Sequence, residues 1–155
     1  MAPAAGEEAT LHASCVVVGE AGILIRGPSG AGKSTLALEL LDAARLRGLH
    51  ARLVGDDRVR VAHRHGRLVA RPHPAIAGRI ERRGLGILAH PHQDAAIVRL
   101  VVDRDATPPP RLPEPEACEA TILRVRLPRL VSCAGDGIAA IALDRLGGLS
   151  VTALT

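Results

Sequence analysis

Residues 27–34, GPSGAGKS, have the spacing of a phosphate-binding loop, G-x-x-x-x-G-K-[ST]. An apolar run at 21–25 precedes the loop and a helix-patterned run at 34–46 follows it, which is the context that the motif requires. Glycines let successive backbone N–H groups converge on an anion, and the N-terminus of a helix adds positive potential. Lys33 would then reach the β- and γ-phosphates of a nucleotide, and the Ser34 hydroxyl would bind Mg²⁺. The alternative is an ordinary glycine-rich turn that caps a helix.

Lys33 is the single lysine in a chain whose 20 lysines and arginines are otherwise all arginine. A loop that wraps phosphates closely has room for a compact ammonium group but not for a planar guanidinium fork. The composition therefore favours the nucleotide site over the plain turn. We expect the nucleotide to be bound by Gly27, Pro28, Ser29, Gly30, Ala31, Gly32, Lys33, Ser34 and Thr35.

Two adjacent carboxylates, Asp56 and Asp57, follow the next apolar segment. A strand–helix–strand path returns them to the sheet edge that carries Lys33, where one could face a metal's water shell and the other could transfer a proton. The alternative is a turn-forming aspartate pair that opens a hairpin. Asp103 also ends an apolar run and competes for the metal-side position, but its neighbours Arg104 and Asp105 indicate a solvated turn, so it ranks second.

The elements that must position these residues are mostly strands. Apolar and alternating runs predict more strands than helices, and therefore an α/β domain with a mixed β-sheet and flanking helices. We expect a flexible N-terminal tail at 1–10 and a single domain at 11–150. The expected elements are a hairpin at 15–18 and 22–26, a helix at 34–46, a strand ending at Val54, a hairpin at 58–62 and 67–70, loop or short helix at 72–92, a strand at 97–102, a proline-rich connector at 107–116, a strand at 121–128 and a helix at 138–146.

Composition excludes several classes of function. The chain has 155 residues, a net charge of +4 and no Phe, Tyr or Trp, so it lacks the aromatic platforms on which nucleic-acid bases stack. Its apolar runs are far shorter than the roughly 18 residues of a membrane span. Its three cysteines show no C-x-x-C spacing, and its first ten residues do not have the pattern of a signal peptide. We therefore expect no nucleic-acid or membrane partner and a cytoplasmic location.

A family resemblance appears when the motifs are taken in order. His12, the GPSGAGKS loop, LVGDD at 53–57 and IERRGLGIL at 80–88 follow one another as they do in HPr kinase/phosphorylase. ERRGLGI is similar to that family's E-x-R-G-L-G-I signature, and this string with the aspartate pair is the discriminating part. The resemblance covers about residues 11–147. The chain resembles the catalytic, C-terminal domain alone, in a truncated alphaproteobacterial form without the family's separate N-terminal domain.

The resemblance implies a P-loop kinase fold similar to that of HPr kinase and PEP carboxykinase. It implies ATP and Mg²⁺ as cofactors, and transfer of phosphate from ATP to a serine of the phosphocarrier protein HPr, in regulation of the phosphotransferase system and carbohydrate metabolism. The reverse phosphorolysis, in which inorganic phosphate attacks phosphoserine-HPr, would be a second activity. The family forms hexamers, but the helix after the phosphate loop is about two turns longer here than is usual in the family. The hexamer is therefore not carried over, and a homo-oligomer is the expectation.

The resemblance also implies roles for single residues. Asp56 is similar to the general base, with Asp57 supporting it, and His12 to an active-site histidine near the phosphates; Lys33 completes the catalytic set. Glu81, together with Ser34 and Asp57, would lie on the magnesium side. The loop formed by Arg83, Gly84, Leu85 and Gly86 would shape the protein-substrate side.

One segment departs from the family pattern. In the family, catalytic arginines lie between a strand similar to VRLPRL (125–130) and an apolar run similar to GIAAIAL, but residues 131–137, VSCAGDG, contain no arginine. Arg83 is a substitute candidate, and phosphorolysis is the activity that this loss affects most. Two alternatives stay open: a small-molecule P-loop kinase similar to guanylate kinase, and a non-catalytic nucleotide-binding sensor module.

Overall fold

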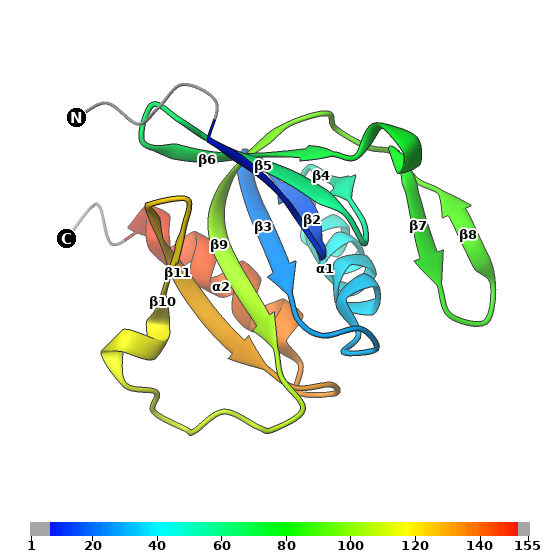
Figure 1. The fold of residues 1–155 in the computed structure, drawn as a ribbon. Helices are drawn as coiled ribbons and strands as arrows, with labels where there is room; N and C mark the ends of the chain where they lie inside the picture. The colour runs from blue at the N-terminus through cyan, green and yellow to red at the C-terminus, as the bar shows by residue number, and fades with distance from the viewer. Residues whose placement is uncertain (1–6, 152–155) are drawn as a thin grey trace.

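The computed structural model describes residues 7–151 (Figure 1). A nine-stranded mixed sheet follows the order β1-β5-β6-β9-β3-β2-β4, and β11 joins it beside β9 with β10 at its outer side. Its strands are β1 (Glu8–Leu11), β2 (Ala13–Val18), β3 (Ala21–Arg26), β4 (Ala51–Gly55), β5 (Val59–Arg64), β6 (Arg67–Pro72), β9 (Ala96–Arg104), β10 (Glu119–Ile122) and β11 (Val125–Ser132). The remaining elements are a separate hairpin, β7 (Arg79–Arg82) and β8 (Gly86–Ala89), the helices α1 (Lys33–Leu46) and α2 (Ile138–Val151), and two short 3₁₀ turns, Pro74–Ile76 and Pro115–Cys118.

The sheet topology determines where the site forms. Strand β2 pairs antiparallel with both β3 and β4, so β3 and β4 run in the same direction with β2 between them. Helix α1 connects the end of β3 to the start of β4. The carboxyl ends of β3 and β4 therefore meet at one edge of the sheet, and the residues that follow each strand lie close together.

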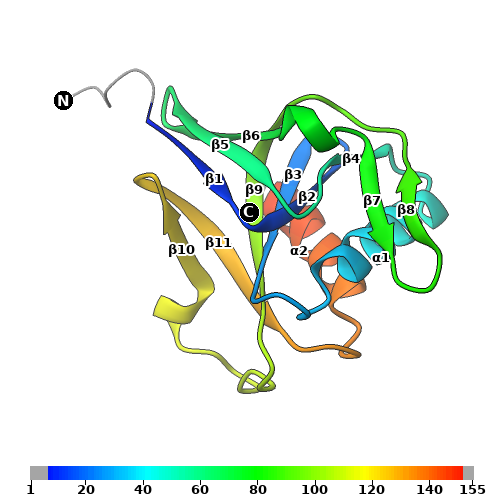
Figure 2. The ribbon, with the colours of Figure 1, turned by 45° about the vertical axis from the view of Figure 1, so that its right-hand side comes forward.

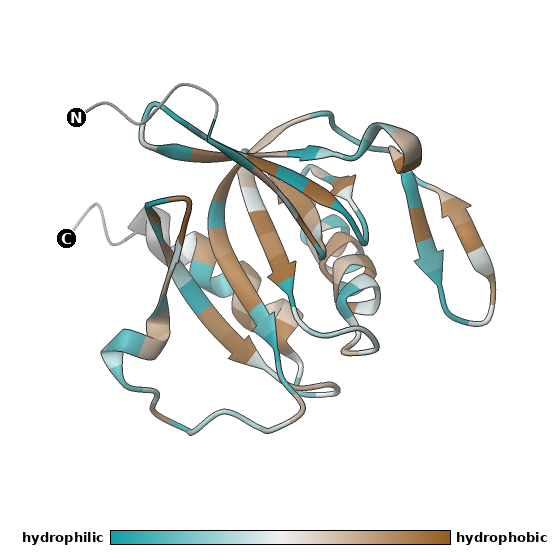
Figure 3. Cartoon of the chain, in the orientation of Figure 1, coloured by the Kyte–Doolittle hydropathy of each residue, from teal (hydrophilic) through white to brown (hydrophobic). Residues whose placement is uncertain are grey.

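Two hydrophobic clusters hold the layers together without any aromatic side chain. On one face, alternate residues of the central strands, such as Ile23 and Ile25, pack against Leu36 and Leu40 of α1 and against α2. On the other face, residues such as Leu24 pack with β5, β6, β10 and β11. Figures 1 and 2 show both helices on the same face of the sheet, and Figure 3 shows the central strands β3 and β9 as mainly hydrophobic.

Most of the expected elements are present. The hairpin before the phosphate loop, the helix after it, the strand ending near Val54 and the hairpin turning at His65 and Gly66 are all confirmed. The mixed α/β class is also confirmed. The last helix begins at Ile138 as expected and continues to Val151.

Three expectations were wrong in part. Residues 8–10 belong to β1, paired with β5, and only residues 1–6 of the expected tail lie outside the described residues. Residues 79–89 form the β7–β8 hairpin instead of loop or short helix. The single strand expected at 121–128 is interrupted, because Leu123 and Arg124 adopt left-handed φ angles of 46° and 67° and turn the chain from β10 into β11. A tight turn made by two non-glycine residues carries no sequence signal.

The expectation for Asp103 was also wrong. Its carboxylate is not in a solvated turn: it accepts two hydrogen bonds of 2.8 Å from Arg26 and one of 2.6 Å from Arg129. Burial alone would raise the pKa of Asp103, but the hydrogen bonds and charges of the two arginines lower it overall. Asp103 therefore links β3, β9 and β11, and its carboxylate is fully engaged in these bonds.

Among the described helices, none has the length and apolar character needed to cross a membrane.

Candidate active site

The phosphate loop joins β3 to α1 at the centre of the sheet edge. Gly30 and Gly32 have φ angles of 82° and 87°, which glycine adopts without steric cost. Gly32 is the N-cap residue of α1 and supplies no capping side chain. Lys33 is almost fully buried, and its Nζ donates hydrogen bonds of 2.9 Å to Gly27 O and 3.0 Å to Pro28 O. These two bonds tie the lysine side chain back to the start of its own loop.

Asp56 connects this loop to two other elements. Its Oδ1 accepts hydrogen bonds of 2.7 Å from Ser34 Oγ and from Ser14 Oγ, and its Oδ2 accepts one of 3.2 Å from the backbone N–H of Glu81. The residue is only 5% exposed. Asp56 thus holds the start of α1, strand β2 and strand β7 together beneath the site.

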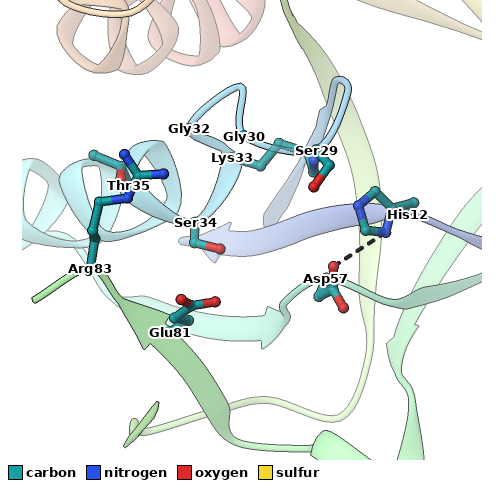
Figure 4. A pocket seen from close by; sticks show the side chains of 10 residues that line it. All are labelled: His12, Ser29, Gly30, Gly32, Lys33, Ser34, Thr35, Asp57, Glu81 and Arg83. Carbon is teal, nitrogen blue, oxygen red and sulfur yellow. Dashed lines mark ion pairs between the residues drawn. The ribbon is translucent and has the colours of Figure 1, made fainter. Parts of the chain in front are cut away.

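Asp57 lies beside Asp56 but faces the other way. Its φ of 66° is in the left-handed region, which aspartate tolerates better than most residues. Its side chain is 60% exposed, and its Oδ1 lies 3.2 Å from Nδ1 of His12. Figure 4 shows this pair on one side of the cavity, with Ser34 and Glu81 in the middle and Arg83 on the far side.

The cavity has a volume of about 190 Å³. This is below the roughly 300 Å³ at which pockets for drug-sized ligands begin, so the cavity could hold a phosphate chain but not a whole nucleotide. Its lining consists of His12, Ser29, Gly30, Gly32, Lys33, Ser34, Thr35, Asp57, Glu81 and Arg83.

The β7–β8 hairpin contributes Glu81 and Arg83 from a part of the chain far from the loop. The backbone bond from Glu81 to Asp56 fixes this hairpin against the site. Its turn includes Gly84, with a φ angle of 91°, and Leu85, which is 72% exposed, and Gly86, with a φ angle of 100°, begins β8. Of the predicted substrate-side residues, only Arg83 therefore lines the cavity, and the other three form the projecting tip.

The donor set around the cavity fits Mg²⁺. In the described part of the chain, no three His, Cys, Asp or Glu side chains are close enough to form a metal site of their own. Magnesium is commonly held by one or two carboxylates together with phosphate oxygens and water. Ser34, Glu81 and Asp57 line one cavity and could supply the protein's share once phosphates are present.

Two residues near the site were missed at the level of sequence. Ser14 is fully buried and donates to Asp56, and the signal for it was a serine inside the apolar run ASCVVV, because a buried hydroxyl needs a partner. Arg104 is also buried and lies behind the loop. A Cβ atom added at Gly32 would lie only 3.2 Å from its Nη2. No sequence signal distinguished Arg104 from the other arginines.

Comparisons with known proteins agree on one family. A family model described as the HPr Serine kinase C-terminal domain matches residues 4–92, which include the loop, the aspartate pair and the β7–β8 hairpin. The HPr kinase/phosphorylase of Mycoplasma mycoides subsp. mycoides is 37% identical over 76 residues, covering 49% of this chain and 22% of that protein. The HPr kinase/phosphorylase of Clostridium beijerinckii is 43% identical over 81 residues, covering 52% of this chain and 25% of that protein.

The matched segment thus corresponds to about a quarter of the length of these relatives. A solved structure described as the Hpr(Ser) kinase/phosphatase from Coxiella burnetii is similar over nearly the whole fold. It aligns with a TM-score of 0.69 and 26% identity, covering 94% of both chains.

Proposed function

The chain belongs to the HPr serine kinase C-terminal domain family, and we propose that it transfers the γ-phosphoryl group of ATP to a serine hydroxyl of the protein HPr. The observation that supports this most is the joint position of the loop and the aspartate pair. Asp56 bonds to Ser34 at the start of α1, and Asp57 lines the same cavity as Lys33. A phosphate chain and a proton acceptor would thereby meet in one place.

The phosphate loop is proposed to bind the triphosphate. Backbone N–H groups at the uncapped N-terminus of α1 would donate to the phosphates, and Lys33 Nζ would exchange its two carbonyl acceptors for phosphate oxygens. Bound Mg²⁺ would neutralise negative charge on the phosphates. Ser34 and Glu81, which line the cavity, would hold that ion, so the Asp57 carboxylate would stay free of the metal.

We propose that Asp57, and not Asp56, accepts the proton of the attacking serine. Asp56 is buried and its two oxygens already accept three hydrogen bonds, whereas Asp57 is exposed in the cavity. His12 contacts the Asp57 carboxylate and would keep it oriented towards the acceptor. The expected roles are therefore exchanged: Asp56 positions Ser34, and Asp57 acts as the base.

The reverse reaction would use the same groups. Inorganic phosphate would attack phosphoserine, and the protonated Asp57 carboxyl would return its proton to the serine oxygen as the P–O bond breaks. The loop at 131–137 has no arginine, so the cation facing the transferred group is proposed to be Arg83, which lines the cavity. We propose that the protein acts in the cytoplasm, where its two proposed substrates, ATP and HPr, are expected to occur.

The test is incubation of the purified chain with Mg²⁺, labelled ATP and HPr. Label on an HPr serine, absent when that serine is replaced by alanine, is the expected result. Label on a nucleotide or metabolite instead would favour a small-molecule kinase. Nucleotide binding without transfer to any acceptor would favour a sensor module. Incubation of the purified chain with phosphoserine-HPr and inorganic phosphate then tests the reverse reaction, whose products would be HPr and pyrophosphate.

A further inference from the structure

Arg104, the last residue of β9, is buried in an unusual environment. Its side chain is only 4% exposed. Nη1 donates hydrogen bonds of 3.1 Å to Ser132 Oγ and 3.2 Å to Cys133 O. Nη1 lies 3.9 Å from Oδ1 of Asp136, and Nε has no hydrogen-bond partner among the described residues.

The side chain packs directly against the phosphate loop. A Cβ atom added at Gly32 would lie 3.2 Å from Arg104 Nη2. A Cβ atom added at Gly27 would lie 2.9 Å from the carbonyl oxygen of Arg104 and 3.0 Å from its Cβ. Two glycines of the loop therefore make room for this one arginine, and the loop cannot shift backward without displacing it.

The charge of Arg104 is poorly compensated inside the protein. A buried charge is costly unless it is paired and hydrogen-bonded. Within residues 7–151, the only ion pair of Arg104 spans 3.9 Å, and its buried Nε has no hydrogen-bond partner. Lys33 and the N-terminus of α1 add further positive potential to the same loop. The neighbouring Arg26 differs, because its guanidinium makes two 2.8 Å bonds to Asp103. An anion bound in the loop would offset the charge that Arg104 leaves uncompensated.

We infer that Arg104 is a positioning residue of the nucleotide site, which holds the phosphate loop through Gly27 and Gly32 and favours the more highly charged phosphate chains. It also donates to Ser132 and Cys133, so it connects the loop to the 131–137 segment that has no arginine of its own. The inference rests on the proposed nucleotide binding and adds a preference for ATP over ADP that originates outside the cavity lining.

The experiment measures the affinities of ATP and ADP for the wild type, Arg104→Met, Arg104→Lys and Arg129→Met at two salt concentrations. Arg129 is the matched control, since it is a partly buried arginine of the adjacent strand that lies outside the cavity lining and is hydrogen-bonded to Asp103 at 2.6 Å and to Ala117 O at 2.9 Å. With Mg²⁺ present, we expect Arg104→Met to weaken ATP binding about tenfold and ADP binding about threefold, because the lost attraction scales with ligand charge and the net charge of Mg²⁺-ATP is about twice that of Mg²⁺-ADP. Arg104→Lys should recover most of the ATP affinity, and Arg129→Met should change neither affinity by more than about twofold.

A role in packing alone predicts a different pattern. Arg104→Met would then weaken ATP and ADP equally, Arg104→Lys would not restore binding, and higher salt would not reduce the difference between wild type and variant. Either that pattern or unchanged affinities in Arg104→Met would overturn the inference. If Arg104→Met does not fold, Arg104→Lys decides: an equal loss of about tenfold for both nucleotides counts against a charge effect, and near-wild-type ATP affinity supports it. Failure of the wild type to bind ATP would instead reject the proposed function.

Discussion

All five residues classed as buried and polar or charged in the described part of the chain belong to one neighbourhood. Each contacts the phosphate loop directly or through one intervening side chain. They are Ser14, Lys33, Asp56, Arg104 and Ser132. Burial of polar groups lowers stability, so their concentration at one sheet edge indicates a functional site.

Replacement of Asp57 separates the two aspartates at the level of single residues. We expect Asp57→Asn to lower the rate of phosphate transfer to HPr by about 10² to 10⁴, because a general base contributes that range. ATP affinity should stay within about twofold, since the loop and Ser34 are untouched. Single-turnover transfer and equilibrium ATP binding measure the two quantities.

Asp56→Asn is the matched comparison for this prediction. The asparagine amide would face two serine hydroxyls in place of a carboxylate, so we expect a loss of about 1 to 3 kcal/mol in the free energy of unfolding, together with weaker Mg²⁺-dependent ATP binding. Normal transfer by Asp57→Asn would return the role of base to Asp56.

The buried thiol of Cys15 makes the free energy of unfolding depend on pH in the alkaline range. Complete burial raises the pKa of its thiol from 9.0 to about 12. Above pH 9.0 the unfolded thiol loses its proton while the folded one keeps it, so this contribution to stability is present below pH 9.0 and is lost as the pH rises towards about 12. The expected slope is about 1.4 kcal/mol per pH unit.

Urea unfolding between pH 8 and pH 11 tests this. The measurement is favourable because the chain has no tyrosine and a single lysine, so few other groups titrate in that range. Cys15→Ala should flatten the slope, whereas Cys118→Ala, at a partly exposed thiol, should not. An unchanged slope in Cys15→Ala would show that another group is responsible.

The β7–β8 hairpin is the element that combines a fixed base with an exposed tip. Its base is bonded to Asp56 and supplies Glu81 and Arg83, while its tip presents Leu85 and Ile87, both 72% exposed. Exposed apolar side chains next to a charged cavity suit a protein substrate better than a small one. The hairpin is therefore the element through which we expect HPr to be recognised.

A double substitution, Leu85→Ser with Ile87→Ser, tests the tip. Since neither side chain is buried, we expect the free energy of unfolding to change by less than about 0.5 kcal/mol. ATP affinity should be unchanged, and the KM for HPr should rise by about tenfold through lost apolar contact. Initial rates over a range of HPr concentrations give the result. An unchanged KM would place the docking surface elsewhere.

At the scale of the whole molecule, ligand binding should stabilise the fold. Mg²⁺-ATP at about 100 times its Kd adds about 2.7 kcal/mol to the free energy of unfolding. For a domain of this size that corresponds to a rise in Tm of about 5 to 10 °C. AMP, which lacks the β- and γ-phosphates, should produce little change, and Lys33→Met should remove the shift with ATP. Equal shifts in the wild type and Lys33→Met would contradict binding at the loop.

The homo-oligomeric assembly that the family resemblance implies stays a prediction for this chain.

The sequence by itself determined the centre of the site. The loop at 27–34, the single lysine, the aspartate pair and the ERRGLGI string are local patterns, and the strand–helix–strand rule was enough to bring Asp56 to Ser34. Alternation in the apolar runs also predicted the central hairpins and the mixed sheet.

Only the tertiary structure decided what each of these side chains faces. Asp56 and Asp57 are equivalent in the sequence, but a left-handed backbone at Asp57 directs one carboxylate into the cavity and the other into a buried hydrogen-bond set. Likewise, Arg104 is one of nineteen arginines until β9 places it behind Gly32. The physical reason is that burial and partners arise from contacts between distant segments, and those contacts, more than residue type, set the cost and the reactivity of a charge.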